Sequence, residues 1–364
     1  MDSPVIIFSH AYDYHAVAVK WALEKQGCKV ILWDGIAEAD SGHATYAMDG
    51  VSSSLFLGGM RCDAFTSAWF RRRSPYRSLR DAHPDSIMFL KNELSSAHEA
   101  LISSVEMRSQ YVVGGISTRR ASSKLLQLEM AKSLGLAVPD TLVSNDYEQV
   151  ADFASRWGRI LVKHFLPHYW GHTASGRMTS VAPSVISDLA KINRRSIEIC
   201  PAIYQEVVDK AYEIRVTVIG DRIFPAKIES RKGEAFLDWR QEFSNSDMLM
   251  SSMTLDTATE RSIRCLMNAL DLHYGCLDFA VDLQGRPVFL EVNPGGQFLF
   301  VEESVPELRL LDAFASMLAQ GSPSYQLGSC DSITDAAFMS SAEYCRWNSE
   351  RVEGREDERF VTII

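Results

Sequence analysis

The sequence lacks the features that mark membrane proteins and secreted proteins. Its apolar runs all fall short of the roughly 18 residues that a membrane-spanning helix needs. The first residues, MDSPVIIFSHAYD, contain neither the basic segment nor the small-residue cleavage site of a signal peptide. We therefore expect a cytoplasmic protein without a membrane partner.

Basic residues are too few for a nucleic-acid-binding protein. The chain has 37 Lys and Arg against 47 Asp and Glu, so its formal net charge is −10, whereas a phosphate backbone requires a basic surface. The seven cysteines are scattered, odd in number and never spaced Cys-x-x-Cys, which favours the reduced thiols of a cytosolic enzyme. We expect no nucleic-acid partner.

The chain opens with a strand–helix–strand pattern. PVIIF and KVILW are apolar runs typical of buried strands, and HAVAVKWALEKQG between them predicts a helix that ends at Gly27. No GxGxxG motif follows the first strand, so the fingerprint of a dinucleotide site is missing. At 364 residues the chain predicts two or three domains, and a second unit begins near residue 116. The sequence indicates a mixed α/β and α+β fold.

Two later segments give weaker signals. TATERSIRCLMNAL predicts a helix that begins with the capping box Thr257-x-x-Glu260, whereas LPHYWGHTASGRMTS is predicted to be a glycine-containing loop. His164, His168 and His172 have the spacing of ligands on one helix face. Pro167 and Gly171 would break such a helix, so we do not expect a transition-metal site there.

The segment CLDFAVDLQGRPVFLEVNP predicts a β-hairpin with LQGR as a four-residue loop. If Asp282 pairs with Pro287, Asp278 lies opposite Glu291, and Asn293 shares their face. Opposed carboxylates repel unless something positive lies between them, and oxygen ligands of this kind suit Mg²⁺. The alternative is a pair of surface acids beside a turn, but the strongly apolar flanks favour the metal site.

These residues resemble a known family. Asp278 with Glu291-x-Asn293 resembles the magnesium site of the ATP-grasp superfamily of carboxylate–amine ligases. NPGGQFLFVE is most similar to the peptide-maturing ATP-grasp ligases of the microviridin, or graspetide, class. AWFRRRSPY and SKLLQLEMAKSLGLAVPDTLVSND resemble further elements of that class, and the likeness runs discontinuously from about residue 66 to residue 305.

The resemblance implies a fold and a set of site residues. It implies an N-terminal βαβ pre-ATP-grasp domain (1–115), two α+β subdomains that clamp ATP (116–204 and 205–325), and a C-terminal extension without an assigned role (326–364). It implies these roles: Asp278, Glu291 and Asn293 for Mg²⁺; Lys124 and Lys163 for the α- and β-phosphates; Glu206 and Val207 for adenine; Glu213 for ribose; Arg215 and Arg240 for the γ-phosphate and the acyl-phosphate.

The resemblance also implies the chemistry. ATP and two Mg²⁺ ions would serve to phosphorylate Asp or Glu side chains of a leader-bearing ribosomal precursor peptide, before Ser or Thr hydroxyls or Lys amines displace the phosphate. The segment 166–181 would act as a lid, Lys227 would contact phosphate or substrate, and a homodimer is compatible. The basic run 71–73 would attract an acidic peptide, or would be a solvated surface run. The alternatives are a ligase acting on a small molecule or a peptide C-terminus, and a nucleotide-binding module without activity.

Overall fold

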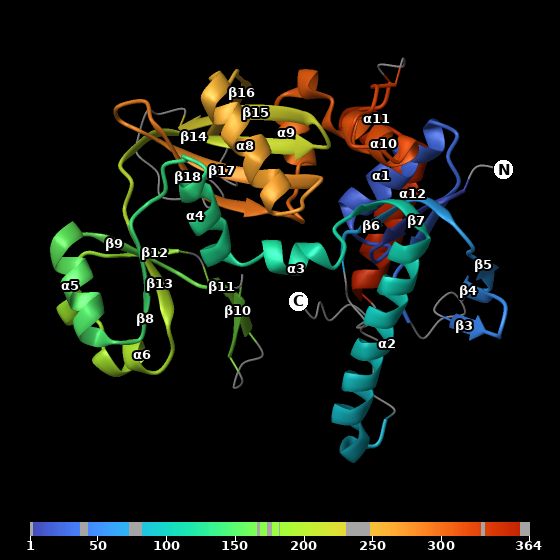
Figure 1. Ribbon diagram of the computed structural model, residues 1–364, viewed down its shortest axis with the longest axis horizontal. Coiled ribbons are helices and arrows are strands. Elements are labelled where there is room, and N and C mark those ends of the chain that lie inside the picture. Colours follow the sequence, from blue (N-terminus) through green and yellow to red (C-terminus); the bar gives the residue numbers. More distant parts are fainter. Residues whose placement is uncertain are drawn as a thin grey trace.

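The computed structural model describes residues 3–36, 43–72, 82–165, 168–172, 177–181, 183–230, 248–328 and 332–356. Within these ranges the strands form five sheets. Three of these sheets are named here by their strands: the N-terminal sheet (β1, β2, β6 and β7), the central sheet (β8, β9, β12 and β13) and the largest sheet (β14 to β18). Figure 1 shows the central sheet with α5 on one side of the molecule, the N-terminal sheet on the other, and the largest sheet above and between them. No helix in the described ranges has both the length and the apolar character needed to cross a membrane.

The N-terminal sheet is parallel, with the order β2-β1-β6-β7. The predicted strand–helix–strand opening is confirmed, and Gly27 follows the first helix with a φ of 82°. Alternate residues of β1 face different helices, so Ile7 packs with the first helix and Phe8 packs against the long second helix. The bounds are β1 Val5–Phe8, α1 Tyr14–Lys25, β2 Val30–Trp33, β6 Phe65–Phe70, α2 Ile87–Arg108 with η2 Pro84–Ser86 before it, and β7 Ser109–Val113.

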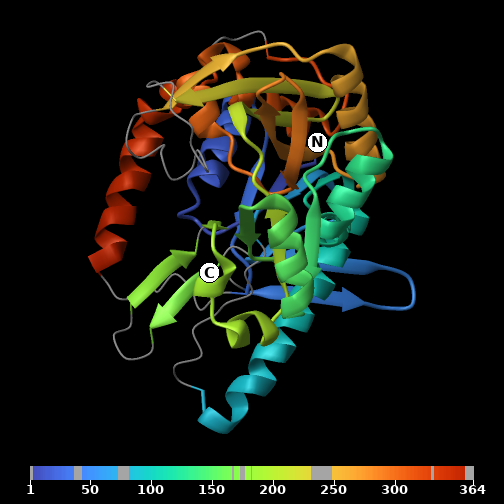
Figure 2. The same cartoon turned by 90° about the vertical axis from the view of Figure 1, so that its left-hand side faces the viewer.

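A small antiparallel sheet and a projecting helix extend this part of the molecule. The small sheet has the order β3-β4-β5. Figures 1 and 2 both show α2 extending away from the body of the molecule as an arm. The bounds of the small sheet are β3 Ala44–Met48, β4 Ser53–Leu57 and β5 Met60–Arg61.

The central sheet has the order β12-β9-β13-β8, and α5 packs on it through Val150 and Phe153. Beyond it, the segment predicted as a loop contains an antiparallel hairpin, so the loop prediction is wrong for residues 168–172 and 177–181. An extended strand also agrees with the expectation that the three histidines share no helix. The bounds are β8 Thr141–Ser144, α5 Tyr147–Trp157, β9 Ile160–Lys163, β10 His168–His172, β11 Arg177–Val181, β12 Ser184–Ile186, η3 Leu189–Lys191, α6 Arg194–Glu198 and β13 Ala202–Glu206.

The largest sheet is antiparallel, with the order β16-β15-β14-β17-β18, and α4 and α8 cover one of its faces. Asp256, not Thr257, caps α8 by accepting from the amides of Ala258 and Thr259, so the helix is capped one residue before the predicted position and the predicted capping box is wrong. The bounds are α3 Ser117–Ala121, α4 Lys124–Ser133, β14 Lys210–Ile219, β15 Arg222–Ser230, β16 Met248–Ser252, α8 Thr257–Ala269, β17 Tyr274–Asp282 and β18 Pro287–Asn293.

The C-terminal helices return to the N-terminal sheet. The helix α10 packs between α1 and β6, and Phe338 and Trp347 pack against Tyr14 of α1. Both ends of the chain therefore contribute to one hydrophobic core. The bounds are α9 Leu299–Ser304, η5 Pro306–Leu308, α10 Leu310–Gln320, α11 Asp335–Met339 and α12 Ala342–Glu356.

Candidate functional site

The hairpin of β17 and β18 carries the predicted metal ligands. Asp278 lies directly opposite Glu291, and Asn293, two residues beyond, shares the face of Glu291. The predicted pairing of the two acids is confirmed. Asp278 is 3% exposed, whereas the side chain of Glu291 is 25% exposed. The pair therefore lies at the border between the core and the surface.

The predicted register is wrong nearer the turn. The partner of Pro287 is Val281, not Asp282, because the ladder shifts by one residue along the hairpin. The extra residue is Leu290, which forms a β-bulge. The bulge allows Phe289 to face the core although the acid two positions later faces the site.

Each of the opposed acids has a cationic partner. Arg215, opposite Asp278 on β14, donates from Nη1 to Asp278 Oδ1 at 2.8 Å. Burial lowers the pKa of Arg215, but the Asp278 carboxylate, together with Cys276 and Tyr274, raises it, and the net shift is upward. Lys124, the first residue of α4, places Nζ 3.5 Å from Glu291 Oε2 and donates to the His164 carbonyl at 3.1 Å. These contacts bring α4 and the end of β9 to the hairpin.

Three of the predicted nucleotide residues lie at the ends of the central strands. Lys163 is the last residue of β9 and is half-buried. Glu206 ends β13, and its amide donates to the Asp140 carbonyl at 3.0 Å. Burial, and then the Asp140 carboxylate, raise the pKa of Glu206. Val207 opens the short link from the central sheet to β14, so the predicted adenine contacts lie where the two sheets join.

The other predicted residues divide between the two faces of the largest sheet. Glu213 is buried on the face that carries Arg215 and accepts a hydrogen bond from Lys210. Lys227 pairs with Glu229 at 2.5 Å and lies on the opposite face, and its contact with phosphate or substrate stays a prediction. Arg240 lies outside the described residues.

A tight segment follows the last predicted ligand. Asn293 Oδ1 accepts from the Gly295 amide at 3.0 Å, and the Asn293 carbonyl accepts from the Gly296 amide at 3.2 Å. The Gly296 carbonyl accepts from the buried Tyr274 hydroxyl at 2.7 Å. The Gln297 carbonyl accepts from Arg215 Nη2 at 3.0 Å, so this segment and Asp278 hold the guanidinium from two sides.

The N-terminal domain contributes residues that the sequence did not single out for this place. His15 Nε2 accepts from the amides of Phe298 and Leu299, and Arg71 Nη1 donates to the Gly295 carbonyl. The Arg71 side chain is 1% exposed and lies beside Asp13. The prediction that Arg71 attracts a peptide from the surface is therefore wrong.

Arg72 differs from Arg71 in exposure. The Arg72 side chain is 46% exposed and pairs with Asp13 Oδ2 at 3.0 Å, and Arg73 lies outside the described residues. The signal in the sequence was the position of these arginines directly after an apolar strand. At the carboxyl end of a buried strand in a parallel sheet, side chains face the place where ligands commonly bind.

The donor set fits the predicted metal. Two carboxylates and one amide oxygen on one face are hard ligands, and Mg²⁺ commonly keeps several waters beside one or two carboxylates. The described residues contain no group of three or more His, Cys, Asp or Glu side chains arranged to hold a metal ion. A magnesium site here therefore depends on the amide oxygen of Asn293 as well as on Asp278 and Glu291.

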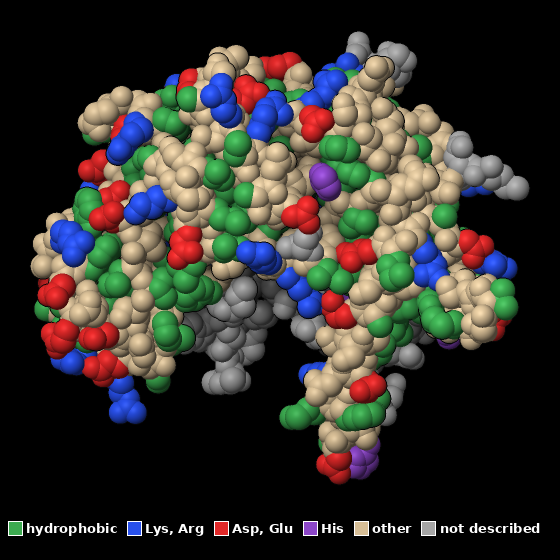
Figure 3. Space-filling model, in the orientation of Figure 1, with side chains coloured by type: hydrophobic (Ala, Val, Ile, Leu, Met, Phe, Trp, Pro, Cys, Tyr) green, Lys and Arg blue, Asp and Glu red, His purple; other side chains and the backbone are tan. Residues whose placement is uncertain are grey.

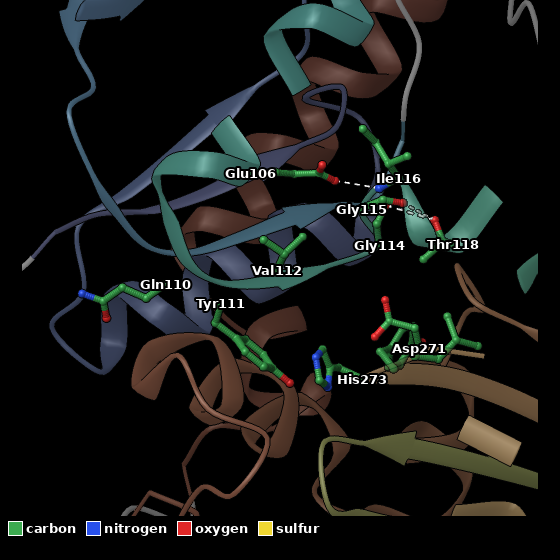
Figure 4. A pocket seen from close by; sticks show the side chains of 12 residues that line it. Glu106, Gln110, Tyr111, Val112, Gly114, Gly115, Ile116, Thr118, Asp271 and His273 are labelled. Atoms are coloured by element: carbon green, nitrogen blue, oxygen red, sulfur yellow. Dashed lines mark hydrogen bonds between the residues drawn. The ribbon is translucent and has the colours of Figure 1, made fainter. Parts of the chain in front are cut away.

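The molecule has a hollow between two of its lobes and a separate small pocket. Figure 3 shows the molecule hollowed between the lobe that carries α5 and the projecting α2. Figure 4 shows a separate pocket of about 330 Å³ where β7 and the start of α3 meet the turn before β17. Its lining includes Glu106, Asp271 and the facing rings of Tyr111 and His273, whose centroids lie 4.9 Å apart. Among the described residues, none of the predicted site residues lines this pocket.

Solved structures match this chain, whereas sequence comparisons do not. No family model matches the sequence, and no curated protein does. A RiPP-associated ATP-grasp ligase of Chryseobacterium gregarium, in complex with ADP and a leader and core peptide, matches with a TM-score of 0.78. The match covers 91% of this chain and 100% of that one, with 21% identity. The chain has the ATP-grasp fold.

A second comparison agrees with this ATP-grasp fold. The macrocyclase MdnC from Microcystis aeruginosa MRC, bound with the precursor peptide MdnA, has a TM-score of 0.73 and 25% identity over 88% of this chain and 100% of that one. The macrocyclase MdnB from the same source has a TM-score of 0.69 and 24% identity, over 87% of this chain and 99% of its own. The predicted fold class is confirmed, because these ATP-grasp structures match the mixed α/β chain over about nine tenths of its length.

Proposed function

We propose that this protein is an ATP- and Mg²⁺-dependent carboxylate ligase that modifies a ribosomally made precursor peptide. It activates Asp or Glu side chains as acyl-phosphates and joins them to Ser or Thr hydroxyls or Lys amines. The observation that carries the proposal is a row of opposed residues on adjacent strands, Arg215, Asp278 and Glu291, with Asn293 on the same face. The likeness to ligases solved with ADP and with leader or precursor peptides supports it.

Each part of the site has a role in this proposal. Mg²⁺ held by Asp278, Glu291 and Asn293 would neutralise charge on the phosphates. Residues 116–204 and 205–325 would form the two subdomains around ATP, beside the N-terminal domain and the extension 326–364. The proposed nucleotide contacts are Lys124 and Lys163 at the α- and β-phosphates, Glu206 and Val207 at adenine, Glu213 at ribose, and Arg215 and Arg240 at the γ-phosphate.

The reaction has two displacements. A carboxylate oxygen of the peptide attacks the γ-phosphorus, the bond to the β-phosphate oxygen breaks, and ADP leaves. A hydroxyl or amine then attacks the acyl carbon and loses its proton, and inorganic phosphate leaves. Phosphoryl transfer needs in-line placement and fixed positive charge more than covalent help. Arg215 supplies such a charge, because Asp278 and the Gln297 carbonyl prevent its guanidinium from turning.

Mass spectrometry tests this proposal. The protein is incubated with Mg-ATP and candidate precursor peptides, first those encoded by short neighbouring genes and rich in Thr, Asp and Glu. We expect the peptide to lose one water for each ester or amide formed, with one ADP released per loss. A gain in mass would indicate addition of a residue and contradict macrocyclisation. Absence of ADP release with every peptide would contradict ligase activity.

A pair of matched variants ties the activity to the hairpin. Glu291→Gln removes a ligand charge and also a repulsion between opposed acids, so we expect no Mg²⁺-dependent ATP turnover in a folded protein. Glu229→Gln is the control, because Glu229 also pairs with a lysine in the same sheet but on the opposite face. Full turnover by Glu291→Gln would contradict the metal assignment.

A further inference from the structure

The N-terminal sheet holds a segment of its own chain at the edge where such sheets commonly bind ligands. Its strand order is β2-β1-β6-β7, so the chain continues to one side of β1 with β2 and to the other side with β6. The topological switch point therefore lies between β1 and β6, and ligands usually bind beyond the carboxyl ends of the strands at such a point. Asp13 and His15 follow β1, and Arg71 follows β6. All three contact one another or the segment 295–299, which comes two residues after Asn293.

Arg71 holds the first part of this segment. Its guanidinium donates to the Gly295 carbonyl and, at 3.4 Å, to the Gly296 carbonyl. Its Nε lies 3.4 Å from Asp13 Oδ2. Burial alone would raise the pKa of Asp13, but Arg71 and then Arg72 lower that pKa to about 2, so the carboxylate stays charged. The segment is thus tied to a buried ion pair, which gives its carbonyls charged donors.

His15 holds the last part. Its Nε2 accepts from the Phe298 amide at 3.0 Å and from the Leu299 amide at 3.2 Å, where α9 begins. Burial, and then the charge of Arg71, lower the pKa of His15 to about 3. The ring is therefore neutral at physiological pH, and Nε2 is free to act as the acceptor while Nδ1 carries the proton.

The opposite side of the segment supports the proposed reaction centre. The Gln297 carbonyl anchors Arg215, and the Gly295 amide orients the oxygen of Asn293. A displacement of the segment would therefore shift both the guanidinium near the transferred phosphate and the amide ligand. Glu206 and Val207, the proposed adenine contacts, lie where the central sheet is linked to β14. They make none of the hydrogen bonds that hold the segment 295–299.

We propose that His15 and Arg71 are positioning residues: from the N-terminal domain they fix the segment 295–299 and thereby aim Arg215 and Asn293. This inference rests on the proposed ligase function. It predicts a particular pattern of defects. Partners behind a metal ligand typically contribute about 10-fold to 100-fold in metal affinity or activity, whereas binding of the nucleotide base should not depend on them.

The test compares variants that keep or remove the acceptor. In His15→Gln the amide oxygen can replace Nε2, whereas His15→Leu has no acceptor of similar reach. We expect His15→Leu to lower kcat about 10-fold to 100-fold and to raise the Mg²⁺ concentration for half-maximal turnover, with KM for ATP nearly unchanged. His15→Gln should recover most of the loss. Arg71→Met and Arg71→Lys form a second pair. We expect Arg71→Met, which has no donor, to show the same losses as His15→Leu, and Arg71→Lys, which keeps a charged donor, to recover most of them.

Two measurements do not depend on turnover. Calorimetric binding of ADP should tighten with Mg²⁺ in the wild type and lose that tightening in His15→Leu, while binding without Mg²⁺ is kept. Amide hydrogen exchange at Phe298 and Leu299 should quicken in His15→Leu but not in His15→Gln. Ser67→Ala is the control, because it removes a buried hydrogen bond of 2.7 Å from β6 to the Leu318 carbonyl and does not touch the segment.

The outcomes separate this inference from the proposed function. A wild-type protein that neither turns over ATP nor binds Mg-ADP contradicts the proposed function. In that case the positioning contact is judged by hydrogen exchange alone, and equal exchange rates at Phe298 and Leu299 in the wild type and in His15→Leu would contradict it. A wild type that is active, with His15→Leu equal to it in kcat and Mg²⁺ dependence, contradicts the inference. So does a loss in Ser67→Ala that matches the loss in His15→Leu, because the role would then be general stability.

Discussion

At the scale of single residues, two adjacent glycines show how closely the segment after β18 is packed. A Cβ on Gly296 would lie 2.6 Å from Cys276 Cβ, 2.7 Å from its sulfur and 3.2 Å from Arg215 Nη2. A Cβ on Gly295 would meet only Asn293 Oδ1, at 3.9 Å. Gly296 is therefore required for close approach to β17, whereas Gly295 is not required by packing.

This difference predicts unequal effects of the same substitution. Gly296→Ala should lower the free energy of unfolding by about 1–3 kcal/mol, because the added methyl group overpacks a buried site. It should also reduce ATP turnover, since Arg215 is one of the groups displaced. Gly295→Ala should stay within about 0.5 kcal/mol of the wild type. Urea denaturation measures both, and equal destabilisation by the two variants would contradict the packing argument.

At the scale of elements, the bulge in β18 explains where prediction from sequence succeeded and failed. The opposition of Asp278 and Glu291 was predictable, because apolar strands with acids at matching positions leave few registers. The bulge at Leu290 was missed, because Leu290 is as apolar as its neighbours. The sequence did contain evidence of the bulge. Phe289 and Glu291 are two positions apart and would share one face of a regular strand, although a phenylalanine favours the core and a glutamate does not.

Near Val292, one side chain of α4 bonds to the outer edge of β18. Gln127 Nε2 donates to the carbonyls of Val292 at 2.8 Å and Ala121 at 2.7 Å, and its Oε1 accepts from the Val292 amide at 3.0 Å. Gln127 is 2% exposed, so water does not replace these partners. The strand that carries Glu291 and Asn293 is thereby fixed to the helix that begins with Lys124.

Replacing this glutamine tests the junction. Gln127→Leu keeps a similar volume but leaves three buried backbone groups without partners, at about 1–3 kcal/mol for a group. We expect a loss of about 3 kcal/mol or more in the free energy of unfolding, and weaker Mg-ADP binding. Gln149→Leu, on the exposed side of α5, is the matched control and should change little. Thermal and urea unfolding of both variants would check this, and similar stability of the two would contradict it.

At the scale of the whole molecule, contacts between the chain ends could not be predicted from sequence. Tyr14 donates to Asp335 at 2.6 Å across 321 positions, and Trp347 donates to the Ala11 carbonyl at 2.7 Å across 336. Arg71 and Gly295 are separated by 224 positions. Local patterns predict the strands that carry such residues, but not that Arg71 is buried while Arg72 is exposed, because burial is decided by a partner far along the chain.

The burial of His15 beside Arg71 predicts how stability depends on pH. Its pKa of about 3 in the folded protein lies below the ordinary 6.5, so below pH 6.5 the unfolded chain takes up a proton that the folded chain refuses. The stability that neutral His15 contributes is therefore present above pH 6.5 and is lost as the pH falls toward 3. Between about pH 7.5 and about pH 5 this loss amounts to about 2 kcal/mol.

A comparison with His15→Gln isolates this term from other titrations. Glu302, whose pKa burial raises to about 7, titrates in both proteins and cancels in the difference. Asp13 also cancels, because its pKa of about 2 keeps it charged over this range while its acceptor role toward Arg71 is kept. Urea denaturation at the two pH values should show the wild type losing about 2 kcal/mol relative to His15→Gln on acidification. A difference that is independent of pH would mean that the His15 ring takes up a proton as readily in the folded protein as in the unfolded chain, and the neutral acceptor at the start of α9 would have to be abandoned.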